Sequence, residues 1–239
     1  MNKKSVVGCE SDLPIGAKFH EGIAAGWSKG YSGGSFGRRL SFFLPILDRN
    51  INPSQNWLDL GCGSGVLTKE LLDRGALVSA VDGSPSMLRE AQKHINDKEH
   101  GVVVWLQSDV QSVAQFSDAS FDGILCSSVV EYVKCPYTVL SEAARLLRSD
   151  GKLIISLPPK LSAVRTAQKI IRKIGLLFGR DVFSYLAVSR FEIDPNHLQE
   201  WLSKAGFALD HITYFDPILP KVFLAIFRPA LMILEARKK

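Results

Sequence analysis

The stretch Trp57 to Gly65, WLDLGCGSG, is an apolar run that ends in three closely spaced glycines. Where a buried strand turns into a helix through glycines, the backbone can approach a nucleotide, because no side chain stands between them. The next apolar run, Leu77 to Val81, ends in Asp82, whose carboxylate can accept hydrogen bonds from ribose hydroxyls. The two runs predict a binding site for a cofactor that contains adenosine.

The glycine spacing separates the families of nucleotide-binding folds. Nicotinamide and flavin folds use G-x-G-x-x-G/A, but the residue three positions after Gly63 is the β-branched Val66. A phosphate-binding P-loop needs Gly-Lys-Ser or Gly-Lys-Thr, and neither follows these glycines. Because neither pattern fits, the assignment depends on the residues that flank the glycines.

The flanking residues resemble the motifs of class I S-adenosylmethionine-dependent methyltransferases. Six motifs occur in the order of that family: Leu58–Gly65, Asp82–Leu88, Ser108–Val110, Phe121–Asp122, Glu131–Val133 and Leu146–Leu153. Within the class, the chain is similar to the type 11-like group that methylates small molecules and precursors of ubiquinone or menaquinone. The resemblance implies that the chain is a methyltransferase with S-adenosyl-L-methionine as its cofactor.

Apolar runs alternate with helical segments, which predicts an α/β fold with a mostly parallel sheet. The resemblance implies a single Rossmann-like, doubly wound domain with seven strands, including an antiparallel edge strand. The expected strands are Asn56–Leu60, Leu77–Asp82, Val102–Ser108, Gly123–Ser127, Lys152–Ser156, Ala208–Tyr214 and Met232–Ala236. The expected helices are Pro85–Asn96 after the N-cap Ser84, Tyr137–Leu147 and Pro195–Lys204.

The chain has 239 residues, of which 46% are hydrophobic and 22% charged, which is enough for one α/β domain with a buried sheet. We expect residues 1–45 to form an N-terminal lid and helical segment. Residues 46–239 would form the methyltransferase domain, with a basic amphipathic insert at 160–190. The start of the chain lacks the apolar core of a signal peptide, and the four cysteines form no C-x-x-C pair. These features favour a cytoplasmic protein, with peripheral attachment to a membrane left open.

The resemblance also implies a set of cofactor contacts. The glycines would border the methionine and ribose portions, Asp82 would hold the ribose hydroxyls, Met87 would pack on the adenine, and Asp109 would accept from the adenine amine. Two alternatives stay open, because Asp59 could merely cap its turn and Asp109 could cap the next helix. The full set expected to bind the cofactor through this core is Asp59, Gly61, Cys62, Gly63, Gly65, Asp82, Gly83, Met87, Asp109 and Val110.

The segment Phe19 to Arg39 is rich in aromatic residues and glycines, which predicts a movable lid over the site. Tyr31 or Arg38 could reach the methionine carboxylate, because an arginine fork suits that group. Alternatively, Arg38 and Arg39 form the solvated start of a helix.

Transfer of an activated methyl group depends mainly on positioning and desolvation. A phenolic or carbon-acid acceptor also needs a general base near neutral pH, usually a histidine. The candidates are Glu131, which follows the fourth strand, and His20 in the lid. The histidine that the family carries next to this glutamate is Tyr132 here, so a catalytic histidine cannot simply be transferred to that position. The sequence indicates no metal ligands.

The insert from Lys160 to Phe183 has apolar residues at helical spacing with six basic residues between them, and its first acid is Asp181. This pattern suits the surface of an anionic membrane, although a helix that covers the active site with a solvated basic face is the alternative. A second apolar stretch, Pro217 to Leu234, is interrupted by charges and prolines, so it is no transmembrane span. Together they favour a small, lipophilic acceptor that is methylated on oxygen or carbon.

A net charge of +5 and an isoelectric point near 9.0 also permit a nucleic-acid acceptor. Enzymes that methylate base amino groups carry an Asn/Asp-Pro-Pro-aromatic turn after the fourth strand, where this chain has Ser127 to Val130. Nucleic acid is therefore an unlikely partner. A nucleic-acid or protein methyltransferase, a non-catalytic adenosine-cofactor-binding protein and an NAD-dependent dehydrogenase are the alternative functions.

Overall fold

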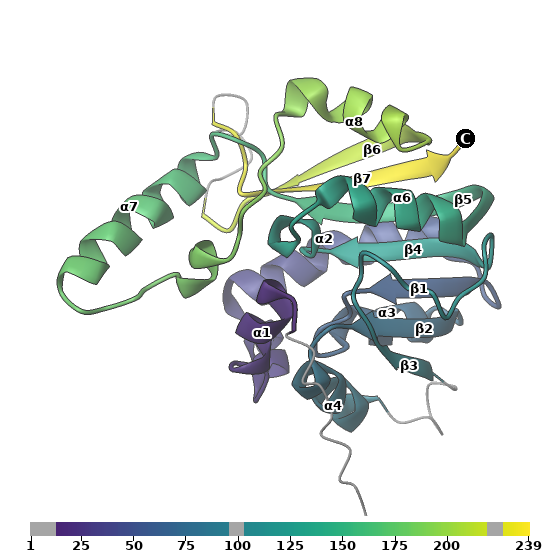
Figure 1. Cartoon of the computed structure of the whole chain (residues 1–239), viewed down its shortest axis with the longest axis horizontal. Coiled ribbons are helices and arrows are strands. Elements are labelled where there is room, and N and C mark those ends of the chain that lie inside the picture. Colours follow the sequence, from purple (N-terminus) through teal and green to yellow (C-terminus); the bar gives the residue numbers. More distant parts are fainter. Residues whose placement is uncertain (1–12, 96–102, 219–226) are drawn as a thin grey trace, which may run out of the picture.

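The computed structural model describes residues 13–95, 103–218 and 227–239. Its centre is a seven-stranded sheet with the order β3-β2-β1-β4-β5-β7-β6 (Figure 1). All strand pairs from β3 to β5 are parallel, and β7 is antiparallel to both β5 and β6. The strands are β1 (Asn56–Leu60), β2 (Leu77–Asp82), β3 (Val103–Gln107), β4 (Phe121–Ser127), β5 (Leu147–Leu157), β6 (Phe207–Phe215) and β7 (Leu231–Lys238).

The seven expected strands and the doubly wound α/β fold are confirmed. The antiparallel pair lies at one edge as expected, and within it the reversed strand is β7, one position in from the outermost strand β6. The order reverses between β1 and β4, which is the point where ligands bind in open α/β sheets.

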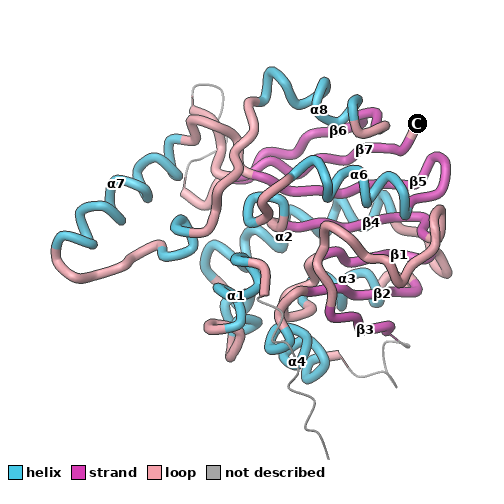
Figure 2. The backbone as a smooth tube through the Cα atoms, viewed as in Figure 1, coloured by secondary structure: helices cyan, strands magenta, loops and turns pink. Residues whose placement is uncertain are grey.

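Helices cover both faces of the sheet, as the alternation of side chains along each strand requires (Figure 2). Leu58 points to a core formed with α6 (Pro136–Leu146) and α8 (Leu198–Lys204). Trp57, its neighbour on β1, points to a second core on the opposite face. Three helices build that face: α2 (Gly34–Asn50), α3 (Val66–Asp73) and α4 (Pro85–His94).

The expected helices are present with small differences at their ends. α4 ends at His94, and Ser84 accepts a hydrogen bond from the Met87 N–H at its start, as expected of an N-cap. The expected end at Asn96 lies outside the described residues. The segment opened by Asp194 is a 3₁₀ turn, η4 (Pro195–His197), that continues directly into α8.

The N-terminal segment comprises α1 (Ile15–Glu21), the 3₁₀ helix η1 (Trp27–Ser32) and α2. α2 crosses the expected lid boundary at residue 45, and its second half is part of the core, because Phe43, Ile46 and Leu47 are buried. Its last turn is held to the sheet through Arg49 and Asn50, which both bind the buried carboxylate of Glu235 on β7.

The insert after β5 contains α7 (Ala163–Leu177), which projects from the body of the molecule at the left of Figure 1. Only Val164 and Arg165 of this helix are buried. No helix in the described part of the chain is long and apolar enough to cross a membrane.

Candidate active site

A cavity of about 560 Å³ lies at the carboxyl ends of the parallel strands, next to the point where the strand order reverses. Four parts of the chain line it: the loops that follow β1, β2, β3 and β4, the N-terminal segment, the insert that contains α7, and the end of β6 with the start of β7. The cavity therefore joins the glycine loop to the segments that the sequence assigned to the acceptor.

The glycine loop is tied to the neighbouring strand by backbone hydrogen bonds, since the N–H groups of Gly61 and Cys62 both donate to the Val81 carbonyl at 2.7 and 2.9 Å. Gly61 has a φ of +83°, and a Cβ there would lie 2.2 Å from a methyl of Val129. Gly63 has a φ of +53°, and a Cβ there would meet no atom within 4 Å. Gly61 is thus required for packing, whereas Gly63 borders the cavity.

Asp82 and Asp59 give the cofactor end of the cavity an acidic character. Asp82 accepts from the Gly63 N–H and the Ser84 N–H, both at 2.8 Å. Asp59 is buried and accepts from the Thr68 hydroxyl at 2.6 Å. In the described part of the chain, neither carboxylate is paired with a lysine or arginine. Two carboxyl groups in this arrangement favour a positively charged ligand.

Burial is the main influence on both groups. It raises the pKa of Asp82, against the hydrogen bonds from the Ser84 and Gly63 amides. Burial raises the pKa of Asp59 to about 7, against the Thr68 hydrogen bond, and the charge of Asp82 adds to the increase. Burial likewise raises the pKa of the Cys62 thiol. The thiol therefore stays protonated at neutral pH.

The other expected cofactor residues fall into two groups. Cys62, Gly83, Asp109 and Val110 line the cavity, as do Asp59, Gly61, Gly63 and Asp82. Asp109 also accepts from the Gln111 N–H at 2.9 Å, so it caps its own loop while it faces the cavity. Gly65 and Met87 lie outside the cavity lining. A Cβ at Gly65 would lie 2.8 Å from that of Ala91, which makes this glycine a contact between helices, and Met87 is buried.

α1 closes over the cofactor end of the cavity. It is fastened to the start of α4 by Glu21, whose Oε2 accepts from the Ser86 N–H at 2.9 Å and from the Ser84 hydroxyl at 2.5 Å. Burial alone would raise the pKa of Glu21, but the hydrogen bonds from Ser84 and Ser86 outweigh it and lower the pKa below its usual value. The Ala17 side chain lies close to Gly83, where an added Cβ would be 2.9 Å away.

His20, on the same helix, lines the cavity with a defined orientation. Its Nδ1 lies 2.8 Å from the Gly16 carbonyl, so Nδ1 carries the proton and Nε2 of the neutral ring has a free lone pair. The imidazole packs edge-on against Trp27 and Tyr132, with ring centres 5.6 and 5.1 Å apart. The contact with Tyr132 connects α1 to the loop after β4.

The structure separates the two neighbouring arginines of α2. Arg38, the expected candidate, donates to the Pro217 carbonyl at 2.7 Å and does not line the cavity. Arg39 lines the cavity, donates to the Ser127 hydroxyl at 2.5 Å and lies over the Phe43 ring. Tyr31 also lines the cavity. Because adjacent helical residues point about 100° apart, a pair of arginines in the sequence could not show which one faces inward.

Arg39 has no carboxylate partner in the described part of the chain. A half-buried guanidinium that faces a cavity and has no carboxylate partner of its own attracts an anionic group of a ligand. The signal for it was present in the sequence as the pair Arg38-Arg39.

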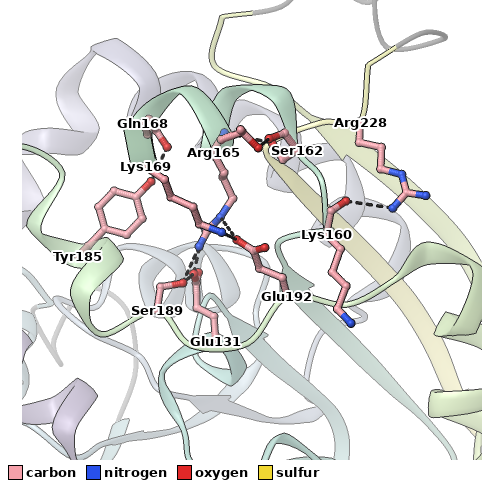
Figure 3. A network of polar contacts seen from close by, with 11 residues as sticks. Glu131, Lys160, Ser162, Arg165, Gln168, Lys169, Tyr185, Ser189, Glu192 and Arg228 are labelled. Atoms are coloured by element: carbon pink, nitrogen blue, oxygen red, sulfur yellow. Dashed lines mark hydrogen bonds and ion pairs between the residues drawn. The ribbon is translucent and has the colours of Figure 1, made fainter. Parts of the chain in front are cut away.

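Glu131 also lines the cavity, and it is buried. Its Oε2 accepts from Arg165 Nη1 at 3.2 Å and from the Ser189 hydroxyl at 2.5 Å (Figure 3). Both partners come from the insert, Arg165 from α7 and Ser189 from the segment after it. The sequence motif identified Glu131 but gave no indication of Arg165 as its partner.

Comparison with known proteins identifies the family. The methyltransferase domain family matches residues 58–155. A ubiquinone biosynthesis O-methyltransferase of Nitrosococcus oceani is 32% identical over 169 residues, which cover 67% of each chain. The chain belongs to the class I S-adenosylmethionine-dependent methyltransferases. The methyl donor of this family is S-adenosyl-L-methionine.

The similarity of this chain to its curated relatives covers about two thirds of its length. A ubiquinone biosynthesis O-methyltransferase of Xanthomonas oryzae pv. oryzae is 30% identical over 157 residues, which cover 65% of this chain and 64% of the relative. The chain thus spans slightly less than two thirds of the length of this relative.

Solved structures agree with the fold of this methyltransferase. A chain in the Haloferax volcanii complex between the Trm112 methyltransferase activator and a methyltransferase superimposes with a TM-score of 0.68 at 17% identity, covering 92% of this chain and 97% of that one. The magnesium protoporphyrin IX methyltransferase of Synechocystis, solved with bound S-adenosylhomocysteine, gives a TM-score of 0.58 at 20% identity, covering 100% of this chain and 90% of that one.

The contact between Glu21 and the start of α4 leads to a first prediction. Replacing Glu21 by Ala removes the acceptor for Ser84 and Ser86, so α1 should open more often. We expect S-adenosylhomocysteine to dissociate about tenfold faster, which corresponds to about 1.4 kcal/mol. Stopped-flow displacement measures this rate. Because the pKa of the docked Glu21 is lowered, the contact is complete at neutral pH and weakens only as the pH falls into the acid range.

The matched control is Glu200→Ala, which removes an exposed acid on α8 that is paired with Lys204. This variant should release the product at the rate of the unmodified protein. Equal release rates for Glu21→Ala and Glu200→Ala would show that α1 is not held closed by Glu21.

Proposed function

We propose that this methyltransferase transfers the methyl group of S-adenosylmethionine to an oxygen or carbon atom of a small, mostly apolar acceptor. The observation that carries the proposal is the single cavity that the glycine loop, Asp82 and Arg39 share with aromatic side chains and α7. A donor held at one end and an acceptor held at the other would meet inside one shared cavity. The names of the curated relatives support a small-molecule acceptor.

The acidic and basic groups of the cavity suggest how the cofactor lies. The sulfonium is a cation, and it would lie near Asp59 and the glycine loop, with the ribose hydroxyls on Asp82. The amino acid carboxylate would reach Arg39, with Tyr31 beside it, and the adenine would lie toward Asp109 and Val110. This arrangement places the sulfonium and the carboxylate of the cofactor beside residues of opposite charge.

Methyl transfer itself is an in-line displacement. The acceptor oxygen forms a bond to the methyl carbon while the bond from carbon to sulfur breaks, which leaves S-adenosylhomocysteine. The acceptor must also lose a proton, and we assign its removal to Nε2 of His20, the nitrogen left free by the Gly16 contact. Glu131 is the second candidate, and because Arg165 and Ser189 occupy its Oε2, its Oε1 would be the oxygen that takes the proton.

The exposed side of α7 supports delivery of the acceptor from an anionic membrane surface. Five apolar side chains of α7 and its end are about half exposed or more: Ile170 at 54%, Ile171 at 49%, Ile174 at 51%, Leu177 at 83% and Phe178 at 77%. Lys169, Lys173 and Arg180 lie on the same projecting segment and are exposed. A projecting helix with apolar and basic side chains suits the interface of a bilayer with negatively charged lipids.

The cofactor assignment is tested by calorimetric titration with S-adenosylhomocysteine. We expect micromolar affinity in the unmodified protein, loss of binding in Asp82→Ala, and about tenfold weaker binding in Arg39→Ala because a charged hydrogen bond is lost. Arg38→Ala is the matched control and should bind normally. Equal losses in the two arginine variants would remove Arg39 from the site, and binding of NADH alone would overturn the function.

The role of His20 is tested by methyl transfer to the best acceptor found by screening lipid extracts. His20→Ala should lower the turnover number about a hundredfold or more, with little change in cofactor affinity. His94→Ala is the control, since His94 binds the Ser28 hydroxyl and does not line the cavity. Unchanged turnover in His20→Ala would transfer the role to another group.

Membrane attachment is tested by flotation with vesicles in which about a quarter of the lipid is phosphatidylglycerol. We expect the protein to float with these vesicles and to stay in the soluble fraction with purely neutral ones. The double change Ile174→Glu and Leu177→Glu should abolish flotation. Leu77→Glu is the control, because Leu77 is 56% exposed and lies on β2, away from α7. If the unmodified protein does not float, delivery from a membrane is rejected and the acceptor must reach the cavity from solution.

A further inference from the structure

Arg165 differs from the other basic residues of α7. The helix carries Lys169, Arg172 and Lys173 on its outer sides, but Arg165 is only 5% exposed and lines the cavity. Removing a guanidinium from water is costly unless it is paired and hydrogen-bonded. Its position therefore calls for an explanation inside the cavity.

The pairing of Arg165 leaves the cavity wall electrically neutral. Arg165 Nε lies 3.1 Å from Glu192, and Nη1 lies 3.2 Å from Glu131 (Figure 3). Lys169 binds the same Glu192 at 2.6 Å. The two carboxylates thus balance the charges of Arg165 and Lys169. A charged ligand would then bind to the group of this network that still has unused hydrogen-bond donors or acceptors.

The unused hydrogen-bonding groups of Arg165 are N–H donors. The guanidinium has five N–H groups, and within the described residues three of them bind Glu192, Glu131 and the Ser189 hydroxyl. One N–H on each of Nη1 and Nη2 therefore remains for a molecule in the cavity. The Tyr185 hydroxyl donates to Oε1 of Gln168, which leaves the Gln168 amide N–H₂ as a further donor in the same wall.

Glu131 supplies the complementary acceptor. Within the described residues, Arg165 and Ser189 both donate to Oε2 of Glu131, so Oε1 is the oxygen available to a bound molecule. The neighbouring walls are largely aromatic and apolar, with Ile23, Phe36 and Phe183 among the lining residues. A ligand that fits has an apolar body and one polar end.

We propose that Arg165 and Glu131 form the polar anchor for the acceptor, and that the acceptor carries an ionised oxygen, either a carboxylate or a phenolate. Arg165 donates to this oxygen, with Gln168 beside it, and Glu131 accepts from a neighbouring hydroxyl. Arg165 is a specificity-determining and positioning residue, because it binds the acceptor without touching the methyl group. The inference rests on the proposed function, since it concerns the acceptor of that same cavity.

A purely structural role would not require this geometry. An apolar pair would fasten the base of α7 to the sheet at no desolvation cost, because replacing buried ion pairs by apolar residues is often neutral or stabilising. An anchor for an anionic oxygen needs a guanidinium that is fixed in place and still has donors toward the cavity. Glu131 and Glu192 fix it, and the Tyr185 ring lies 5.8 Å from its central carbon.

The experiment compares matched anionic and neutral probes in protein saturated with S-adenosylhomocysteine. The carboxylate pair is 2-naphthoate and 2-naphthamide, and the phenolate pair is 4-nitrophenol above neutral pH and 4-nitroaniline. Binding is followed by calorimetry. In the unmodified protein, the anionic member of at least one pair should bind about tenfold more tightly than the neutral one, and the responding pair identifies the kind of oxygen.

Two variants decide whether Arg165 causes the preference. Arg165→Met should abolish it, and the double change Arg165→Met with Glu131→Gln should do the same without leaving a buried acid unpaired. Arg172→Met is the control and should keep the preference, because Arg172 binds Asp181 at the surface. Affinity for S-adenosylhomocysteine should stay within about twofold in all three variants.

Several results would overturn the inference. These are a preference that survives in the double variant, the same affinity for both members of each pair in the unmodified protein, and no binding of any probe at millimolar concentration. Absence of S-adenosylhomocysteine binding in the unmodified protein is a separate result, which would reject the proposed function itself.

Discussion

The carboxylate of Asp82 is the interaction on which the rest of the site depends. Its two oxygens hold the Gly63 amide of the glycine loop and the Ser84 amide at the start of α4. The first contact fixes the loop after β1 to the end of β2, and the second fixes the turn on which α1 rests. Because Glu21 of α1 binds Ser84 and Ser86, the position of α1 follows from the same carboxylate.

Charge is arranged along the cavity in a way that suits a cationic donor and an acceptor with an apolar body and one anionic end. The end near β1 and β2 carries Asp59 and Asp82 without basic partners in the described residues, and the middle carries Arg39. The far end is closed by the neutral network around Arg165. A methyl donor and an acceptor would thus be distinguished by charge before they are distinguished by shape.

The attachment of α7 explains how one helix can serve two purposes. Only its first turn is buried, and that turn enters the cavity wall through Arg165. The following turns extend into solvent with apolar and basic side chains. The same helix therefore links an outer surface to the interior of the site, and the link consists of a few polar contacts rather than a large apolar interface.

The sequence by itself determined the seven strands, the glycine loop, Asp82 and the family. These features are encoded locally, because a buried parallel strand is a short apolar run and the motif lies within a few residues of its end. The tertiary structure alone decided that Arg39 rather than Arg38 faces the cavity, that Met87 and Gly65 are packing residues, and that Arg165 is the partner of Glu131. The directions of Arg39 and Met87 depend on the rotation of a helix about its axis, which the sequence of a single turn does not determine. The packing of Gly65 depends on how closely α4 approaches it. The pairing of Arg165 with Glu131 joins residues 34 positions apart, a contact that forms only when the insert folds back over the sheet.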